Sequence, residues 1–389
     1  MQHILDFLKE KEKSSLLRTL NPISNRQKSV ISINGKQYLD FSSNDYLGFA
    51  ENKHIIRAHK NNLKTITNFG STGSRLITGD YKLMHTLESK IAQLKQKPKA
   101  LIFNSGYQAN IGIISSIMGQ KDAIFADKLV HASIIDGCKL SQAKLFRFSH
   151  NNETHLQELL TNHRKKYNQA LIITESVFSM DGDLAPIKEL SKIKKEHNCL
   201  LMVDEAHATG LFGKNGAGLV NELNCSDQVD IIMGTFSKAL GGFGAYVASS
   251  ELIYKYLINT ARSFIYSTAL PLPIIAWNIA SLEQLKKNHE KLASKVHSNA
   301  KLLNNALKKL GLHTPSKSQI VPIILGTNEN TINTAKQLKQ HGLWVTPIRY
   351  PTVPKNKARI RISINYNHRK KDIENLINKL ANENKNRVY

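Results

Sequence analysis

The stretch ALIITESVFSMDGDLAPIKELSKIKKEHNCLLMVDEAH, residues 170–207, decides the fold. Its two ends, ALIITES (170–176) and LLMVDEAH (200–207), are continuous apolar runs rich in Ile, Leu and Val. Such runs are typical of strands that are buried on both faces of a sheet. The segment between them, APIKELSKIKKEHN (185–198), has a helical pattern. A strand, a helix and a second strand in this order predict two parallel strands joined by a helical crossover.

The same alternation continues on both sides of this stretch. Further strand candidates are ALIFNS (100–105), AIFAD (123–127), KLFRFS (144–149), IIMGTFS (231–237) and GAYVASS (244–250). We therefore predict an α/β fold whose large domain, residues 45–273, contains a mostly parallel sheet with active-site residues at the carboxyl ends of its strands. Residues 1–44 are expected to form an amphipathic helix and an arm. After Pro271 and Pro273 a long helix and short strands predict a smaller C-terminal α/β domain, residues 274–389.

Composition limits the class of protein. Of the 389 residues, 41% are hydrophobic and 22% are charged, which is ordinary for a globular enzyme. No apolar run reaches the roughly 20 residues that a membrane-spanning helix needs, and the N-terminus lacks a signal-peptide core. Three widely spaced cysteines give no disulfide or zinc pattern. We expect a cytoplasmic protein with no metal site and no membrane association.

The net charge is +24, from 54 basic and 30 acidic residues. A basic protein can bind an acidic partner, either a nucleic acid or an acidic carrier protein. The basic residues are scattered, however, and few aromatic residues lie among them, so we expect no nucleic-acid binding. An acidic protein carrier stays open, as does a composition rich in lysine that has no function of its own.

Lys238 lies in GTFSKALGGFGAYV (234–247), directly after a predicted buried strand. A lysine at this place can form a Schiff base with an aldehyde. The glycines that follow permit a tight turn or a close approach of the backbone to a ligand, although they are also compatible with a simple bend between strands.

The segment VDEAHATG (203–210) carries Asp204 and His207 just past another strand. The letters DEAH occur in helicases, but the chain has neither G-x-x-x-x-G-K-[ST] nor G-x-G-x-x-G. We instead interpret Asp204 as a buried carboxylate that needs a cationic partner, because an unpaired buried charge is costly. A protonated pyridine nitrogen would be such a partner.

Other candidate residues surround these. Gly106 and Tyr107 begin a predicted helix whose first N–H groups suit a phosphate, and Thr235 and Ser237 add hydroxyl donors. His131 follows a strand, where its ring could stack on a heteroaromatic ring or be an ordinary partly buried histidine. Together, the anion site, the histidine, Asp-x-x-His and the strand-end lysine match the needs of pyridoxal 5′-phosphate (PLP).

An ordered series of segments resembles the α-oxoamine synthases, which are PLP-dependent acyltransferases of fold type I, the aspartate-aminotransferase-like fold. The series is YLDFSSNDYLGFA (38–50), GSTGSRLITGD (70–80), HASIIDG (131–137), ESVFSMDGDLAPI (175–187), VDEAHATGLFGKNGAG (203–218), TFSKALGGFGAY (235–246) and PTVPKNKARIRISINYNH (351–368). It spans nearly the whole chain.

The resemblance implies a role for each matching residue. Lys238 would hold PLP and move the Cα proton, Asp204 would bind the pyridine nitrogen, and His131 would stack on the ring. The remaining cofactor contacts would come from Gly106, Tyr107, Ser179, His207, Thr235 and, toward the cofactor of a second subunit, Thr268. Ser179 alone could equally belong to an Asp-Gly turn. Substrate contacts would come from Arg18, Asn44, His131, Thr352 and Arg361, the last binding the amino-acid carboxylate.

The segments FSSNDYLGF, RSFIYSTALP and WVTPIRYPTVP look most like the branch of the family that joins L-alanine to a pimeloyl thioester in biotin biosynthesis. The resemblance implies a homodimer as well. Branches that use glycine with acetyl-CoA or succinyl-CoA remain alternatives, and the residues do not distinguish an acyl carrier protein from CoA as the donor. One departure is Thr72, where the family commonly has glycine, which leaves the acyl preference open.

Overall fold

The structure is a computed structural model that describes residues 1–385, and its internal contacts divide the chain into two units. The larger unit comprises Leu47–Ser179 and Leu184–Ala293, and the smaller comprises Met1–Tyr46, Met180–Asp183 and the chain from Ser294 onward. The sequence analysis placed domain boundaries at 45 and 274, whereas the units change at 47 and 294, the latter inside a continuous helix, α11 (Leu272–Lys309). The final residues of the expected C-terminal domain, 386–389, lie outside the described part.

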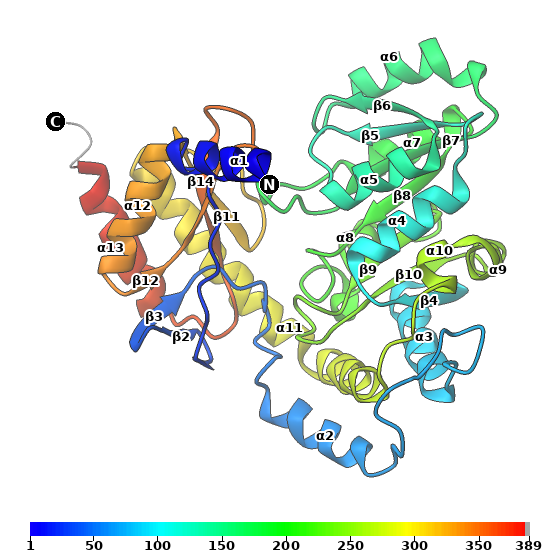
Figure 1. The fold of residues 1–389 in the computed structure, drawn as a ribbon, viewed down its shortest axis with the longest axis horizontal. Coiled ribbons are helices and arrows are strands. Elements are labelled where there is room, and N and C mark those ends of the chain that lie inside the picture. The colour runs from blue at the N-terminus through cyan, green and yellow to red at the C-terminus, as the bar shows by residue number, and fades with distance from the viewer. Residues whose placement is uncertain (386–389) are drawn as a thin grey trace. The chain divides into compact units, whose positions relative to one another are not determined.

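A seven-stranded sheet forms the centre of the larger unit, with the order β4-β10-β9-β8-β7-β5-β6 (Figure 1). The strands are β4 (Lys99–Phe103), β5 (Ala123–Asp127), β6 (Lys144–Phe148), β7 (Ala170–Glu175), β8 (Leu200–Asp204), β9 (Ile231–Thr235) and β10 (Ala245–Ser249). Six of them run in the same direction, and β10 runs antiparallel to its two neighbours, β4 and β9. The predicted strands all form, and the prediction of a mostly parallel sheet is confirmed.

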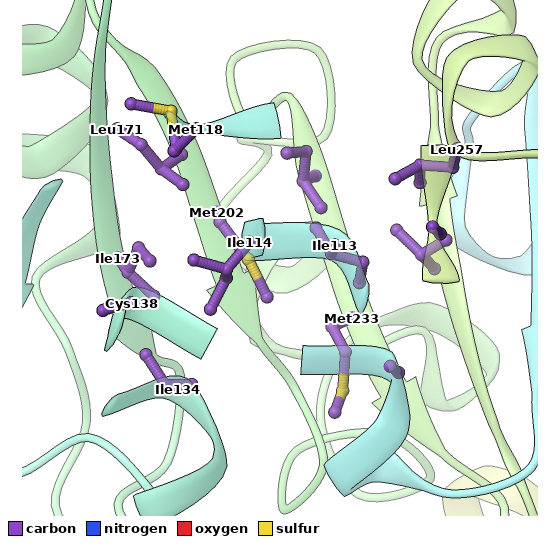
Figure 2. Packing of buried hydrophobic residues seen from close by; sticks show 14 of the residues in the cluster. Ile113, Ile114, Met118, Ile134, Cys138, Leu171, Ile173, Met202, Met233 and Leu257 are labelled. Carbon is purple, nitrogen blue, oxygen red and sulfur yellow. The ribbon is translucent and has the colours of Figure 1, made fainter. Parts of the chain in front are cut away.

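Besides this sheet, the larger unit contains a set of helices. They are α2 (Lys53–Leu63), α3 (Lys82–Lys95), α4 (Gly106–Ile117), α5 (Ala132–Ser141), α6 (Glu153–His163), α7 (Ile187–Glu196), α8 (Leu219–Glu222), α9 (Glu251–Thr260) and α10 (Arg262–Ile265), with single turns at Arg164–Lys166 and Lys214–Gly216. Figure 2 shows Ile113 and Ile114 of α4 among the side chains of Met202 and Met233, which belong to β8 and β9. This apolar cluster holds the first turns of α4 and α5 against the sheet.

The smaller unit contains two sheets. One has the order β1-β2-β3-β12 and the other β11-β14-β13. Their bounds are β1 (Asn25–Gln27), β2 (Val30–Ile33), β3 (Lys36–Asp40), β11 (Ile320–Gly326), β12 (Leu343–Trp344), β13 (Thr346–Ile348) and β14 (Ala358–Ser363). The helices are α1 (Gln2–Lys13), α12 (Asn328–Gln340), α13 (Lys370–Lys385) and the second half of α11.

The helix expected in residues 1–44 forms as α1, and the part of this segment expected to be an arm also supplies β1, β2 and β3. Asn34 and Gly35 turn the chain between β2 and β3, both with positive φ (49° and 73°), a conformation that Asn-Gly adopts readily in two-residue hairpins. Strand β12, from the C-terminal part of the chain, pairs with β3 in parallel. The N-terminal segment is therefore an integral part of the smaller unit.

None of the helices within residues 1–385 combines the length and the apolar character that crossing a bilayer requires, α11 included.

Candidate functional site

Lys238 follows β9 and is half-buried. The chain reverses after it into β10, and this reversal is fixed by the Thr235 hydroxyl, which donates to the carbonyl oxygen of Gly244 at 2.8 Å. The Nζ atom of Lys238 lies 2.7 Å from Nε2 of His207, a buried residue on the loop after β8. The structure thus brings together the lysine and one of the two histidines that the sequence analysis selected.

Asp204 ends β8 and is 5% exposed. Its two oxygens accept hydrogen bonds, Oδ2 from Asn110 Nδ2 at 3.0 Å and Oδ1 from the N–H of Ala206 at 2.9 Å. Among residues 1–385 no lysine or arginine forms an ion pair with this carboxylate. Because a buried carboxylate is stabilised by a cationic partner, this arrangement fits the protonated pyridine nitrogen of PLP.

The candidate phosphate site lies at the N-terminus of α4. Ser105 caps this helix by accepting the N–H of Gln108, and the N–H groups of Gly106 and Tyr107 belong to the first turn, where a helix leaves donors for an anion. The hydroxyls of Thr235 and Ser237 lie 2.8 Å apart. The backbone N–H groups are donors suited to a phosphate, whereas the one proton of the Thr235 hydroxyl is donated to Gly244, so a contact of Thr235 with the phosphate stays a prediction.

Thr268 and Ser179 lie in the same unit. The carbonyl oxygen of the exposed Thr268 accepts a hydrogen bond from Asn104 Nδ2 at 2.7 Å, two residues before α4 begins. Ser179 is half-buried at the end of the segment that follows β7. Their roles toward the cofactor stay predictions.

His131 directly precedes α5 and caps it, since its Nδ1 accepts the N–H of Ser133 at 3.2 Å. The residue is exposed, yet the surrounding chain partly desolvates the ring, and this lowers the pKa of His131, so the imidazole is neutral near pH 7. A neutral ring open on one side is suited to stacking on a heteroaromatic cofactor. The stacking itself stays a prediction.

Glu175, at the end of β7, was missed by the sequence analysis. It is 3% exposed, accepts the backbone N–H of His131 at 2.6 Å and pairs in register with Asp204. Burial, with a contribution from the Asp204 carboxylate, raises the pKa of Glu175 to about 8. Glu175 does not stand out within ALIITES, because its environment depends on Asp204, which lies beside it on the neighbouring strand β8.

The smaller unit holds the other substrate candidates. Arg361 on β14 is 6% exposed, and its guanidinium donates to Asn44 Oδ1 at 3.1 Å and to Ser363 Oγ at 2.8 Å. The hydroxyl of Tyr46 lies 3.3 Å from the same guanidinium, a partner that the sequence analysis did not select. Arg361 and Asn44 are therefore brought together within one unit.

Arg18 and Thr352 also lie close to each other in the smaller unit. Arg18 Nη2 donates to Thr352 Oγ1 at 3.4 Å, and both residues are exposed. The fold thus brings together two candidate substrate-binding residues that are 334 positions apart in the sequence. Their contact with a substrate stays a prediction.

Comparison with known proteins gives the family. The sequence profile of the family described as "Aminotransferase class I and II" matches residues 36–380. This chain belongs to that family. It is 42% identical over 382 residues to the 8-amino-7-oxononanoate synthase of Citrifermentans bemidjiense, covering 96% of each chain. It is 40% identical over 385 residues to that of Geotalea daltonii, covering 98% of this chain and 97% of the other.

Solved structures agree with this assignment. A serine palmitoyltransferase from S. paucimobilis with a bound PLP–myriocin aldimine has a TM-score of 0.91 at 29% identity, covering 98% of this chain and 96% of the other. The 8-amino-7-oxononanoate synthase of Francisella tularensis has a TM-score of 0.78 at 31% identity, covering 90% and 99%. The prediction of a PLP-dependent enzyme of fold type I within this family is confirmed.

Proposed function

We propose that this chain is an 8-amino-7-oxononanoate synthase, which joins L-alanine to a pimeloyl thioester and releases CO2 and the carrier thiol. The observation that carries the proposal is the 40–42% identity to synthases of this name over almost the full length of both chains. The Lys238–His207 contact and the buried Asp204 carboxylate support it, because they supply the groups that a PLP enzyme needs.

The residues of the larger unit would hold the cofactor. The Lys238 amine would bind the PLP aldehyde, Asp204 the pyridine nitrogen, and the N-terminus of α4 with Thr235 the phosphate. Ser179 and His207 would lie near the ring oxygen, His131 against the ring face, and Thr268 would reach the phosphate in a second subunit of a homodimer. PLP supplies an electron sink that stabilises negative charge on the α-carbon of the amino acid.

The protein's own side chains would bind the substrates and move the proton. Lys238 Nζ would take the α-proton of L-alanine, and His207, 2.7 Å away, would orient this amine. Arg361 would bind the alanine carboxylate through two parallel N–H groups, in a pocket shared with Asn44, and Arg18 and Thr352 would contact the acyl chain. The new carbon–carbon bond would replace the thioester bond and release the carrier thiol, and after the loss of CO2 a proton would be returned to the α-carbon.

A spectroscopic and a kinetic experiment test the proposal together. PLP added to the purified protein is expected to give the visible absorption of lysine-bound PLP, and Lys238→Ala is expected to remove it. Initial rates are then measured with L-alanine, glycine and L-serine, each against pimeloyl, acetyl, succinyl and palmitoyl thioesters. Turnover confined to glycine, or to L-serine with palmitoyl-CoA, would show that the chain is another acyltransferase of this family.

L-serine is among the substrates tested because a serine palmitoyltransferase structure matches this chain with a TM-score of 0.91. The sequence relationship favours L-alanine and a pimeloyl donor, since identity to that serine palmitoyltransferase is 29% against 42% for a synthase.

The net charge of +24 supports an acidic acyl carrier protein as the donor. With such a carrier, raising the salt concentration is expected to raise KM for the carrier-bound acyl chain more steeply than for the CoA thioester, because salt screens attraction between proteins. Equal salt dependence of the two donors would exclude electrostatic steering of a carrier.

A further inference from the structure

Asn110 connects the two residues proposed to contact the cofactor ring. It is 1% exposed, on the second turn of α4, and its Nδ2 donates to Asp204 Oδ2 at 3.0 Å and to Ser133 Oγ at 2.9 Å. Ser133 Oγ in turn lies 2.8 Å from Nδ1 of His131. A continuous chain of hydrogen bonds therefore runs from the Asp204 carboxylate to the His131 imidazole.

The backbone is shaped to permit this chain. Asn110 lies one turn beyond Gly106 on α4, and Ser133 lies one turn before Gly137 on α5. A Cβ at Gly137 would lie 3.0 Å from the carbonyl oxygen of Asn110 and 3.1 Å from the Ile114 side chain. A side chain at Gly137 would push α4 and α5 apart by a few tenths of an ångström, so glycine favours the close approach that brings Ser133 within reach of Asn110.

The direction of each hydrogen bond follows from the chemistry of the groups. The Asp204 carboxylate only accepts, so the Asn110 amide nitrogen must face it. The opposite orientation of the amide would set its oxygen against a carboxylate. The Asn110 Oδ1 atom is buried and has no hydrogen-bond partner within residues 1–385, so this side chain acts through its two N–H groups alone.

The same reasoning fixes the proton on His131. Ser133 Oγ accepts from Asn110 and therefore has its own proton available for His131 Nδ1. The Ser133 backbone N–H points to the same nitrogen. Nδ1 thus accepts, and the neutral ring carries its proton on Nε2.

We propose that Asn110 is a positioning residue for the cofactor: it orients the Asp204 carboxylate and, through Ser133, holds His131 in its neutral form with Nδ1 as the acceptor. This inference rests on PLP as the cofactor and not on the identity of either substrate.

Two variants test the proposal, with the PLP dissociation constant measured by titrating the purified apoenzyme. Asn110→Ala removes both donors, and PLP binding is expected to weaken about 10- to 100-fold, the effect of losing one hydrogen bond to a charged group. Ser133→Ala keeps the bond to Asp204 and is expected to weaken binding by less than about tenfold. If the two act through one network, the double variant binds more tightly than the product of the single effects predicts.

A second measurement tests the hydrogen-bond chain in the absence of the cofactor. The pKa of His131 in the apoenzyme, followed by NMR, is expected to rise in Ser133→Ala, because the neutral ring loses the hydroxyl that donates to Nδ1. It is expected to rise in Asn110→Ala as well, because Ser133 Oγ no longer accepts from Asn110 and is free to accept from a protonated ring. A role confined to packing would leave this pKa unchanged.

The matched control is Asn299→Ala, which removes another buried amide. Asn299 Nδ2 donates to the carbonyl oxygen of His368 at 3.1 Å in the smaller unit. This variant is expected to lose stability while keeping the wild-type PLP affinity. If folded Asn110→Ala binds PLP within about twofold of wild type, or if Asn299→Ala weakens binding equally, the inference is overturned. If wild type itself binds no PLP, the proposed function fails instead.

Discussion

Replacing Lys95 by methionine tests how the loop that carries His207 is held. Lys95 and Glu205 have fully buried side chains, and Nζ lies 2.7 Å from Glu205 Oε2 and 2.9 Å from Thr209 Oγ1. Nζ also donates to the carbonyl oxygen of Ala217. Burial alone would lower the pKa of Lys95, but the Glu205 carboxylate raises it, so Lys95 stays protonated at neutral pH.

Lys95→Met leaves the Glu205 carboxylate buried without its cation. Removing one member of a buried ion pair costs about 3–5 kcal/mol, a large share of the 5–15 kcal/mol that stabilises a typical protein. Glu205→Gln in the same chain removes the stranded charge, while its amide oxygen still accepts the N–H of Val220, now bonded to Oε1 at 2.8 Å. The double variant is therefore expected to lie only about 1–2 kcal/mol below wild type.

Urea unfolding of the apoenzyme measures these differences. Lys97→Met is the control, because Lys97 is half-buried and donates to the backbone carbonyl of Val229 instead of to a carboxylate. It is expected to cost about 1 kcal/mol. A loss below about 1 kcal/mol in Lys95→Met, or a double variant no more stable than the single one, would refute the reasoning.

Three further predictions concern single residues. Arg361→Lys is expected to raise KM for L-alanine about tenfold or more with a smaller change in kcat, because lysine cannot bind a carboxylate through two parallel N–H groups; steady-state kinetics would contradict this if only KM for the acyl donor changed. Thr72→Gly is expected to stabilise the protein by about 0.5–1 kcal/mol, because Thr72 has φ +56°, which strains a β-branched residue, and an unchanged or lower melting temperature would be the contrary result. Burial raises the pKa of Glu175 from 4.5 to about 8, so between these pH values the folded apoenzyme binds more protons than the unfolded chain. As the pH rises from 4.5 to 8, the unfolding free energy of the wild type is therefore expected to fall relative to that of Glu175→Gln. Urea unfolding at pH 5, 7 and 9 checks this, and parallel pH profiles of the two proteins would disprove it.

Much of the larger unit could be predicted from the sequence, because its strands are short continuous apolar runs between helical or glycine-marked segments. The places of the candidate residues relative to the strands could be predicted as well, since Asp204 ends β8 while His131 and Lys238 follow β5 and β9. The antiparallel direction of β10 could not be predicted, because an apolar run has the same pattern in either direction.

The smaller unit was harder to predict because its parts are distant in sequence. The turn residues Asn34 and Gly35, which lie between two segments of alternating polarity, are a local pattern that favours the hairpin of β2 and β3, although an arm was expected there. Strand β12 completes that sheet from residues 343–344, a pairing that no local pattern reveals. Tyr46, Glu175 and Asn110 were missed for the same reason, since each acquires its role from a partner on another element.

In the segment VDEAHATG the two consecutive carboxylates Asp204 and Glu205 lie in different surroundings. Successive residues of an extended chain point to opposite sides, so Asp204 meets Asn110 of α4 while Glu205 points to Lys95 of α3. Lys95 stands 110 positions before Glu205, so the sequence alone cannot pair them. Glu205 thus fixes the loop that carries His207, whereas the role of Asp204 toward the pyridine nitrogen stays a prediction. Because the two are consecutive, a shift of one residue in the register of β8 would turn each of them to the opposite side, and Lys95 would lose Glu205 as its partner.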